Sequence, residues 1–492
     1  MTFRHRSFHC RFRAIHAAAC VFAALFLVLH PSSGRCAGYP HLDAQLDALI
    51  KRVLPPNFAV SVQVVELATG RVLMEKNPDL PLVPASTLKA VTSAAALHTL
   101  KPDFTFVTEV LAEEVDGSSV QNLILKGRGD PYLVSEQLFA LTGALRDKGL
   151  REVRGNIIVD DSYFIPGKPL DEAEDLGHRS YHAPYGALSL NFNTVKVTVL
   201  PGKSAGRSAK ILVDPVCEYV VLAGSVKTVQ GSSPARLNYS KESRPDGREV
   251  ITVSGTIGAE APPKSKYVNV TSPAQYTGEV FKEFLLREGI RVGGRVVHGM
   301  TPIGAAPYLA FPSRPLGSTI YWLNKFSNNF MAEQICLGLG AEVHGAPGTR
   351  EKGLSVIRKY LLECGVDEGS FSLTEASGLS RGNRLSASAL VKVLLVASRD
   401  FTYNAEYMAS LGVAGADGTL KEKFTDPGSK RRIRAKTGTL RGVSALAGYG
   451  IWHDGKTCAF AVLVNSLRNG AGFVPYADEI MKGLLDIPLG VR

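Results

Sequence analysis

Residues 83–100 of the chain read VPASTLKAVTSAAALHTL. Pro84 is typical of the residues just before or within the first turn of a helix, and alanine and leucine favour helix interiors. From Ala90 onward nearly every residue is small or apolar, which indicates a helix buried inside the protein. Lys89 interrupts this pattern one turn beyond Ser86, and a charged side chain in such a helix requires a physical reason.

Ser86 and Lys89 are three residues apart, so on a helix their side chains share a face and can touch. Apolar surroundings disfavour the charged form of a lysine and lower its pKa, which leaves an amine able to accept a proton. A serine beside such a base becomes a nucleophile, and backbone N–H groups at the helix start can hold an oxyanion. The alternative is that the Lys89 side chain extends to solvent.

Enzymes with this Ser-x-x-Lys pattern also carry a Lys-Thr-Gly sequence later in the chain. Here that sequence is Lys436-Thr437-Gly438, inside RIRAKTGTLRGVSALAGY, which we interpret as one strand. The lysine and the hydroxyls of Thr437 and Thr439 could grip a carboxylate, and Gly438 would let a substrate approach the backbone closely. The alternative is a polar edge strand without a catalytic role.

The third expected motif is Ser-x-Asn, and the sequence offers two candidates. SLN at residues 189–191 lies in a strand-rich region, whereas SNN at residues 327–329 lies where helices return. At a helix start, Ser327 and Asn329 can both face a cleft, one relaying a proton and the other orienting a substrate. We therefore favour residues 327–329, and three motifs in this order make coincidence improbable.

The coarse periodicity of the chain predicts a domain in two halves, residues 39–104 and 311–492, separated by a β-rich insertion at residues 105–310. The first half is interpreted as a helix, two strands and the apolar helix. The second half is interpreted as several helices followed by a strand at 432–452, a strand at 457–466 and a final helix at 476–486.

Residues 1–38 have the features of a secretory signal: arginines and no acid near the start, an apolar stretch at 14–29, and small residues at 36–38. The protein is therefore expected to be exported and periplasmic; a retained membrane anchor is the alternative. Removal of this segment, which holds five arginines and no acid, changes the formal charge from +11 to +6. That excess suits anionic envelope polymers and peripheral contact with a membrane surface. The basic runs are interpreted as solvated loops, so no nucleic-acid partner is expected.

The cysteines at 217, 336, 364 and 458 are too widely spaced for a zinc pattern or a CxxC redox site. No metal and no cofactor are therefore expected. At most one disulfide is predicted, and Cys336–Cys364 is the favoured pair because both residues lie on predicted neighbouring helices.

From residue 40 to 485 the chain resembles the penicillin-binding serine DD-peptidases, specifically the D-alanyl-D-alanine carboxypeptidase/endopeptidases of the penicillin-binding protein 4 type. The phrases that carry the resemblance are PASTLK, GRGDPYL, GNIIVDDSYF, YGALSLNFN, NKFSNNFMAEQI, EASGLSRGNRLS, GVAGADGTL and AKTGTLRGVSALAGY. The separation of 241 positions from Ser86 to Ser327 also matches the large insertions of this type. The resemblance implies an α+β fold in which a β-lactamase/transpeptidase-like domain, an antiparallel sheet flanked by helices, is interrupted by the insertion.

The resemblance also implies catalytic roles. Ser86 is expected to be the acylated nucleophile and Lys89 its base. Ser327 is expected to pass a proton to the leaving amine, polarised by Lys436, and Asn329 to bind the substrate amide.

For the substrate, the resemblance assigns the terminal carboxylate to Thr437 and Thr439, beside Gly438, and the oxyanion hole to the backbone N–H groups of Ser86 and Thr439. A side pocket for the diaminopimelate side chain is assigned to Asp160, Phe164 and Arg381. Two departures from the family pattern stand out: Glu375-Ala376 replaces the usual Asp-Gly, and Arg441 stands where a neutral residue is common.

The expected partners are peptidoglycan stem peptides, with β-lactams as acylating inhibitors. A β-lactamase-like hydrolase is one alternative, but it would need a deacylating glutamate on a loop after the Ser-x-Asn motif, and none is seen there. A non-catalytic penicillin-binding envelope scaffold is another, but it would be expected to have lost a motif residue. A less specific lysine-assisted esterase is the third.

Overall fold

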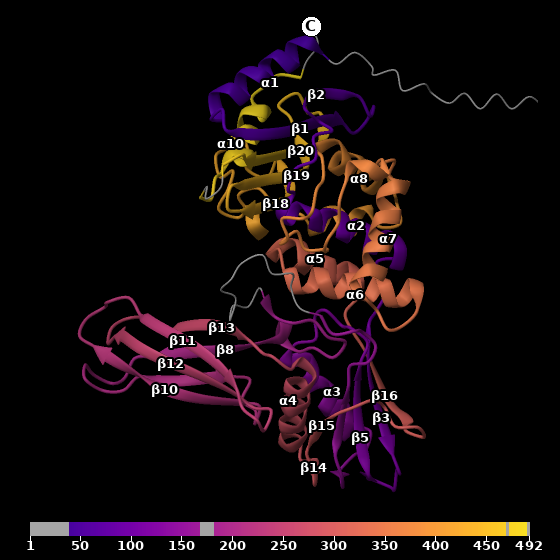
Figure 1. The fold of residues 1–492 in the computed structure, drawn as a ribbon, viewed down its shortest axis with the longest axis vertical. Helices are drawn as coiled ribbons and strands as arrows, with labels where there is room; N and C mark the ends of the chain where they lie inside the picture. Colours follow the sequence, from indigo (N-terminus) through magenta and orange to yellow (C-terminus); the bar gives the residue numbers. More distant parts are fainter. Residues whose placement is uncertain (1–38, 168–181, 469–471, 490–492) are drawn as a thin grey trace, which may run out of the picture. The chain divides into compact units, whose positions relative to one another are not determined.

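The computed structural model describes residues 39–167, 182–468 and 472–489 (Figure 1). Helices and mostly antiparallel sheets occur together, so the predicted α+β class is confirmed. The signal segment expected at residues 1–38 lies outside the described residues. Within the described ranges, every helix is too short or too polar to cross a membrane.

One six-stranded sheet joins the two ends of the chain (Figure 1). Its strand order is β17-β18-β19-β20-β1-β2, and all neighbouring pairs are antiparallel. The strands are β1 (Phe58–Glu66), β2 (Val72–Lys76), β17 (Gly412–Val413), β18 (Ile433–Leu440), β19 (Val443–Ile451) and β20 (Thr457–Ser466). In the pairing of β1 with β20, Val62 stands opposite Val462. The first and last parts of the chain therefore share one sheet.

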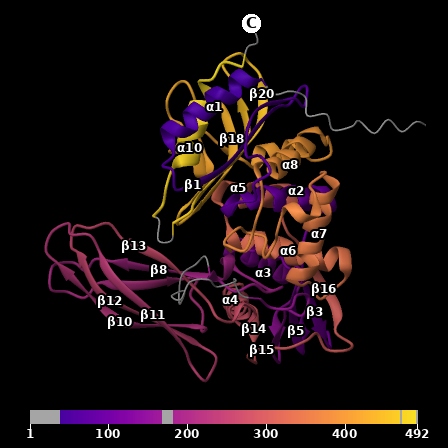
Figure 2. The same ribbon diagram turned by 45° about the horizontal axis from the view of Figure 1, so that its top comes forward.

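Helices cover both faces of this sheet (Figure 2). Along β20 successive side chains point to opposite faces. Phe460, Val462 and Val464 belong to a core with α1 and α10, whereas Ala459, Ala461 and Leu463 belong to a core with the other helices. The helices on the first face are α1 (Pro40–Val53) and α10 (Tyr476–Leu485). Those on the second are α2 (Leu88–Leu100), α5 (Leu316–Phe326), α6 (Asn329–His344), α7 (Arg350–Glu363), α8 (Ala387–Arg399) and α9 (Asn404–Ser410).

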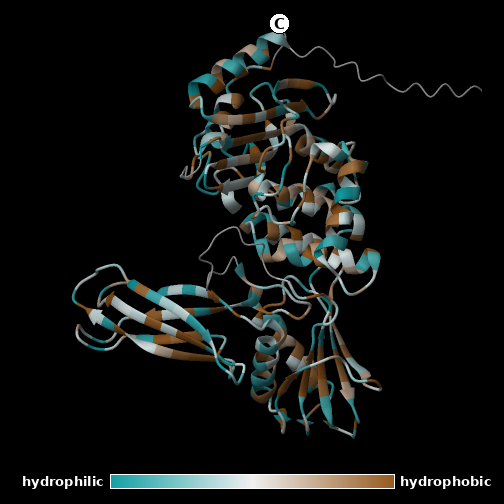
Figure 3. Ribbon diagram, in the orientation of Figure 1, coloured by the Kyte–Doolittle hydropathy of each residue, from teal (hydrophilic) through white to brown (hydrophobic). Residues whose placement is uncertain are grey.

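The helices α1 and α2 differ in how much of their surface is covered. In α1 the buried residues recur every three or four positions and so lie on one face of the helix. Hydrophobic and hydrophilic residues therefore alternate along its ribbon (Figure 3). In α2 the continuous run from Leu88 to Leu97 is buried, because α5, α6, α7 and α8 all pack on it. Its many alanines allow this close approach. The interior helix predicted after Pro84 is confirmed, although residues 85–87 form a 3-10 turn and the α-helix itself begins at Leu88.

The insertion has its own hydrophobic core, separate from those of the six-stranded sheet. Its sheets have the strand orders β15-β7-β5-β3-β16, β14-β6-β4, β10-β12-β11 and β13-β8-β9. The strands are β3 (Val107–Glu113), β4 (Ser119–Val120), β5 (Asn122–Gly127), β6 (Glu152–Val153), β7 (Ile157–Asp160), β8 (Thr194–Leu200), β9 (Lys210–Asp214), β10 (Val220–Val229), β11 (Arg236–Ser243), β12 (Glu249–Gly258), β13 (Lys264–Asn269), β14 (Arg291–Val292), β15 (Val296–His298) and β16 (Ala306–Pro312).

The insertion differs from the sequence-based expectation in two respects. It contains the helices α3 (Ser135–Asp147) and α4 (Pro273–Arg287), which were not predicted in a region interpreted from its strands. Its last strand, β16, ends at Pro312 rather than 310, because it completes the sheet beside β3. The helix α5 then begins at Leu316.

The Lys-Thr-Gly segment also differs from the expectation. Residues 432–452 were interpreted as one strand, but β18 and β19 form an antiparallel hairpin. The chain reverses at Arg441 and Gly442, and Gly442 has a φ of 70°, in the left-handed region that glycine adopts without strain. The motif therefore lies on β18, which β19 fixes on one side along its whole length.

The predicted disulfide is wrong, because the cysteines of the described chain are free thiols. The helices α6 and α7 do pack together, as expected. However, the Cys336 Sγ lies 3.9 Å from the carbonyl oxygen of Arg350, at the start of α7, whereas Cys364 caps its other end. Fourteen residues of helix separate these ends by about 20 Å, far beyond the reach of a disulfide.

We predict that Cys217, Cys336, Cys364 and Cys458 all react with an alkylating reagent when the protein is unfolded without a reductant. All four are buried, so the native protein should react slowly at these positions. Peptide mass spectrometry before and after unfolding provides the measurement. A Cys336–Cys364 linked peptide would contradict the structure.

Candidate active site

Ser86 lies in a single turn of 3-10 helix, Ala85–Thr87, immediately before α2. The turn is constrained: Ala85 has a φ of 46°, and the Thr87 hydroxyl donates to the Pro84 carbonyl at 2.6 Å. A left-handed alanine carries a conformational cost that its surroundings must offset. The serine itself is half-buried, so its hydroxyl remains reachable.

Two glycines press on this turn. A side chain at Gly378 would come within 1.9 Å of the Ala85 carbonyl oxygen, and one at Gly438 within 2.7 Å of the Pro84 oxygen. Gly438 is therefore required for packing of β18 against the nucleophile turn, a constraint that the sequence did not reveal. These contacts fix Ser86 between the β18 strand and the loop that holds Gly378.

Lys89 lies one turn beyond Ser86 and is completely buried. Its Nζ lies 2.9 Å from the Ser86 Oγ and 2.7 Å from the Asn329 Oδ1. A third hydrogen bond goes to the backbone carbonyl of Ser377. The alternative in which Lys89 extends to solvent is wrong, because its amine is held by three separate parts of the chain.

Burial lowers the pKa of Lys89 from 10.5 to about 8, while the charges of Glu375 and Glu333 oppose this effect. Removal from water penalises the ammonium form, and nearby carboxylates favour it. With a pKa of about 8, roughly one-tenth of the lysine is uncharged at pH 7. The amine is therefore available to take the Ser86 proton near neutral pH.

Ser327 faces a second buried lysine. It ends α5 with a φ of 56°, and its Oγ lies 2.8 Å from the Nζ of Lys436 on β18. Asn328 caps α6 by accepting from the Met331 N–H at 3.1 Å, which makes Asn329 the first residue of that helix. This sharp junction between α5 and α6 places Ser327 beside Lys436 and Asn329 beside Lys89.

Burial lowers the pKa of Lys436 well below its usual value, and the positive charges of Lys89 and Lys423 lower it further. The amine also donates to the Thr437 carbonyl at 2.9 Å. An uncharged or readily deprotonated Lys436 can exchange a proton with the Ser327 hydroxyl. The site thus contains two serine–lysine pairs.

The hydroxyl groups expected to bind a carboxylate are ordered by a neighbouring turn. Thr437 donates to the Thr419 hydroxyl at 2.8 Å, and Thr419 lies in the short turn Gly418–Leu420. That turn is anchored by Asp417, which pairs with the buried Lys325 at 2.7 Å. Thr439, further along β18, is exposed. Thr419 was not predicted as a site residue from the sequence, although it lies in the GVAGADGTL stretch that carries the resemblance.

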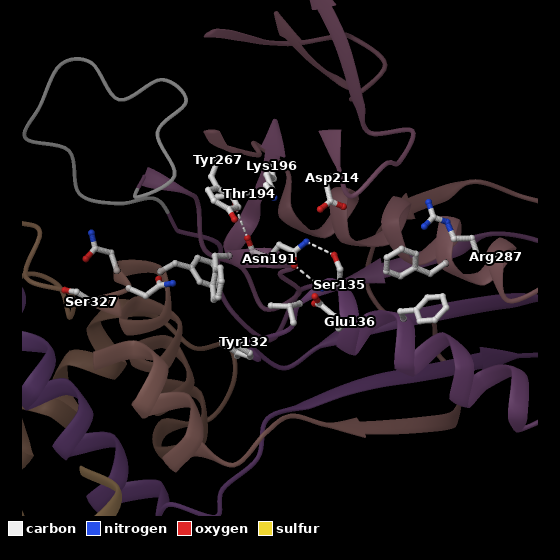
Figure 4. A pocket seen from close by; sticks show the side chains of 17 residues that line it. Tyr132, Ser135, Glu136, Asn191, Thr194, Lys196, Asp214, Tyr267, Arg287 and Ser327 are labelled. Carbon is white, nitrogen blue, oxygen red and sulfur yellow. Dashed lines mark hydrogen bonds between the residues drawn. The ribbon is translucent and has the colours of Figure 1, made fainter. Parts of the chain in front are cut away.

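A cavity of about 920 Å³ extends from the Ser-x-Asn motif into the insertion (Figure 4). Ser327 lies at one end and Arg287 at the other. Both polar and aromatic side chains line it, and the aromatic ones include those of Tyr132, Phe192 and Tyr267. Substrate groups beyond the reacting bond therefore have room next to Ser327.

The other Ser-x-Asn candidate lies inside the insertion. Ser189 donates to the Gly186 carbonyl at 2.8 Å and accepts from Asn193 at 3.0 Å. These bonds stabilise a turn, and no lysine takes part in them. Of the two candidates, only residues 327–329 meet the two buried lysines.

Residues 42–480 match the model of the D-Ala-D-Ala carboxypeptidase 3 (S13) family. A D-alanyl-D-alanine carboxypeptidase from Actinomadura sp. is 34% identical over 457 residues, which cover 89% of this chain and 83% of that protein. The chain belongs to the D-Ala-D-Ala carboxypeptidase 3 (S13) family. It is therefore a serine peptidase.

Solved structures show the same fold. Penicillin-binding protein 4 from Haemophilus influenzae superposes with a TM-score of 0.74 at 22% identity, covering 90% of this chain and 98% of that one. A second crystal structure of that protein, in complex with a β-lactam, gives a TM-score of 0.72 at 22% identity and the same coverage. The expected penicillin-binding protein 4 fold is thus confirmed.

Asp160 and Phe164, which the resemblance assigns to the diaminopimelate side pocket, are both buried in the structure. Asp160 is 1% exposed and accepts bonds from Ser162 and from Thr301, which outweigh burial and hold its pKa below the usual range. Both carboxylate oxygens are thus engaged inside the insertion. The Asp160 carboxylate thus stabilises the insertion, and its role in a side pocket stays a prediction.

Phe164 is also buried, with 1% of its surface exposed. It packs on Gly348, beside Leu337 and Ala341 of α6. Asn329 begins this helix, so Phe164 lies about 12–18 Å along it from the catalytic end. The sequence could not reveal this separation, because residue 164 and α6 approach only in the folded chain.

Arg381, the third residue assigned to that pocket, is exposed and close to the motif strand. Its guanidinium donates to the Arg441 carbonyl at 2.5 Å, where β18 turns into β19. The backbone of Arg441, rather than its side chain, thus makes this contact. Of the three predicted pocket residues, Arg381 alone contacts the Lys-Thr-Gly hairpin.

Sequence analysis missed two buried carboxyl groups of this S13 peptidase. Glu333 lies on α6, one turn beyond Asn329, and Glu375 precedes the Ser377 carbonyl that holds Lys89. The four-residue spacing from Asn329 to Glu333 was a helical signal for a shared face. The replacement of the family's usual Asp-Gly by Glu375-Ala376 drew attention to Glu375, but no local sequence pattern linked Glu375 to Glu333.

We predict that acylation of Ser86 accelerates as pH rises through about 8, where Lys89 loses its proton. A lysine with a lowered pKa is more often uncharged than a free lysine at any given pH, so the acceleration occurs below the usual lysine range. Lys89→Arg keeps the charge but cannot deprotonate, and should acylate no faster than Lys89→Ala. Stopped-flow acylation across pH 6–10 provides the test; near-normal acylation by the arginine variant would exclude Lys89 as the base.

Proposed function

We propose that this S13 peptidase removes the terminal D-alanine from peptidoglycan stem peptides through an acyl-enzyme on Ser86. It also cleaves D-alanyl cross-links as a DD-endopeptidase and is inactivated by β-lactams, and so it remodels the cell wall. The observation that carries this proposal is the pair of serine–lysine contacts, Ser86–Lys89 at 2.9 Å and Ser327–Lys436 at 2.8 Å. Two such pairs in one site suit acylation and leaving-group protonation.

In the acylation step, the Ser86 Oγ attacks the carbonyl carbon of the penultimate D-alanine and its proton passes to the Lys89 amine. The backbone N–H groups of Ser86 and Thr439 stabilise the oxyanion. The C–N bond then breaks, and Ser327 passes a proton to the leaving D-alanine amine. The proton that Lys89 took passes on to Ser327 and replaces the one that Ser327 gave to the leaving amine, so the charges of the site are restored.

Deacylation uses the same groups in the reverse direction. A water molecule attacks the Ser86 ester and transfers a proton to Lys89. The bond between the acyl carbon and the Ser86 Oγ breaks, and the serine regains its proton. The products are a shortened peptide with a free carboxylate and the unmodified enzyme.

Substrate choice follows from the groups around Lys436. Thr437, coupled to Thr419, and Thr439 offer hydroxyls beside a lysine amine, which suits the carboxylate of a terminal D-amino acid. Asn329 uses its Oδ1 to accept from Lys89, which leaves its amide N–H₂ for the acyl peptide. A cross-linked peptide also carries a carboxylate beside the scissile bond, so the same groups serve the endopeptidase reaction.

Sensitivity to β-lactams is supported by the fold relative that was crystallised with a β-lactam. A strained lactam carbonyl beside a carboxylate presents the same two groups as the peptide substrate. The structure gives no support to the alternative that the protein is a β-lactamase. Glu333 follows the Ser-x-Asn motif, but its Oε1 accepts from the Ala376 N–H at 2.8 Å behind Lys89, so it is engaged in the fold.

We also propose an exported, periplasmic location with peripheral contact to the membrane surface. The support is the arginine-rich start and the apolar stretch within residues 1–38, together with the formal charge of +6 in the remainder. This location would place the enzyme beside its proposed polymer substrate.

The decisive test uses Ser86→Ala. The variant should fold normally yet lose covalent labelling by fluorescent penicillin and D-alanine release from a stem pentapeptide. Loss of a nucleophile lowers such rates by several orders of magnitude. Wild-type protein that is labelled on a different residue, or a Ser86→Ala protein that is still labelled, would refute the assignment.

Recognition of the terminal carboxylate gives a further prediction. A stem peptide whose last carboxylate is amidated should lose ten- to a hundred-fold in kcat/KM, because a lost charge-assisted hydrogen bond costs about 1.5–3 kcal/mol. Thr437→Val should cause a similar loss with the free acid and little further loss with the amide, since both changes remove one contact. Equal turnover of acid and amide by the wild type would favour a less specific esterase or amidase.

A further inference from the structure

The loop of residues 375–378 is fastened to the catalytic helices from several directions. Ala376 accepts from the Thr92 hydroxyl of α2 at 2.7 Å and donates its N–H to Glu333 of α6 at 2.8 Å. The next carbonyl, that of Ser377, accepts from Lys89. The position of the loop therefore determines where one of the three oxygen atoms that accept from the Lys89 amine lies.

Glu375 holds this loop through hydrogen bonds that its carboxylate oxygens accept from neighbouring N–H and O–H groups. Its Oε2 accepts from the N–H of Ser377 at 3.0 Å and from the Ser377 hydroxyl. Its Oε1 accepts from the Gly378 N–H at 2.6 Å and from the Asn383 amide at 2.5 Å. Four donors converge on two oxygens that are almost completely buried, which is an environment for an ionised carboxylate.

Glu333 is the neutral member of the pair. The two carboxyl groups are hydrogen-bonded to each other. Burial and the Glu375 charge raise the pKa of Glu333 to about 8. The pKa of Glu375 is lowered by its hydrogen bonds, although burial acts in the opposite direction. Arg350, 3.5 Å from Glu333, opposes the rise without cancelling it. Two buried carboxyls in contact share one proton, as like charges cannot both persist there.

We propose that Glu375, buttressed by protonated Glu333, is a positioning residue that keeps the Ser377 carbonyl on Lys89 and supplies the single negative charge facing the base. The inference rests on the proposed acyl-enzyme function of Ser86. Neither glutamate touches the substrate. Their effect reaches Ser86 through the Lys89 amine and through Gly378, which packs on the Ala85 carbonyl.

The other charged and titratable groups around Lys89 have different effects. Lys436, across the site, disfavours a second positive charge. Arg350 acts on the far side of Glu333, and the Cys336 thiol on α6 is held protonated because burial raises its pKa. The Glu375 charge is therefore the main influence that favours a protonated Lys89, opposing its burial.

Two amide substitutions form a matched pair. In Glu333→Gln a neutral acid becomes a neutral amide, which can still accept from the Ala376 N–H and donate to Glu375. At pH 7, below the pKa of Glu333, acylation by fluorescent penicillin should therefore stay within about two-fold of the wild-type rate. In Glu375→Gln an N–H₂ group replaces an oxygen that faces donors, so acylation should slow about ten- to a hundred-fold with non-covalent affinity unchanged.

The charge is tested by two further variants. In Glu333→Gln/Glu375→Gln no carboxyl of the pair remains to favour the ammonium form, so the pH midpoint should fall by about one unit or more. Glu375→Asp keeps the charge with a shorter reach, so it should retain the midpoint and recover part of the rate. Melting temperatures exclude trivial unfolding, and if Glu375→Gln does not fold, Glu375→Asp and Glu333→Gln still decide the question.

The inference is overturned if Glu375→Gln acylates at the wild-type rate, if Glu333→Gln loses as much as Glu375→Gln, or if the double variant keeps the wild-type midpoint. Each of these outcomes presupposes that wild-type Ser86 is labelled. Absence of labelling in the wild type would instead overturn the proposed function, so the two failures are distinguishable.

Discussion

The burial of one lysine amine governs the geometry of the whole site. Lys89 has no exposed surface, so its Nζ must find partners inside the protein, and it finds them on Ser86, Asn329 and Ser377. These partners belong to the nucleophile turn, the start of α6 and the loop after α7. An unpaired amine in this position would be strongly destabilising, so the three segments are held together by the same requirement that makes the lysine reactive.

The rest of the fold supplies the surroundings that this amine needs. The alanines of α2 allow α5, α6, α7 and α8 to approach closely and exclude water from Lys89. Pairing of β1 with β20 brings the two halves of the domain together, and the β18–β19 hairpin presses Gly438 against the nucleophile turn. The insertion can therefore be long without disturbing the site, because it leaves the domain before β3 and returns after β16.

Features encoded by local spacing could be predicted from the sequence. Ser86 and Lys89 are one helical turn apart, and the interior character of α2 is evident from its composition. Features that depend on distant packing could not be predicted. The resemblance placed Phe164 in a side pocket, but in the structure Phe164 packs beside the C-terminal half of α6. The disulfide prediction failed because Cys336 and Cys364 lie toward opposite ends of α7. The helices α3 and α4 were missed because strand patterns dominated the interpretation of that region.

The acid pair gives the two buried lysines of the site different electrostatic surroundings. The Glu375 charge favours a proton on Lys89, whereas the pKa of Lys436 is lowered by burial and by the positive charges of Lys89 and Lys423. Burial and both positive neighbours thus act on the pKa of Lys436 in the same direction. The terminal carboxylate of the proposed stem-peptide substrate would act in the opposite direction and favour protonation of Lys436. Substrate binding would then charge the lysine beside Ser327, which prepares that serine to protonate the leaving amine only when a carboxylate is present.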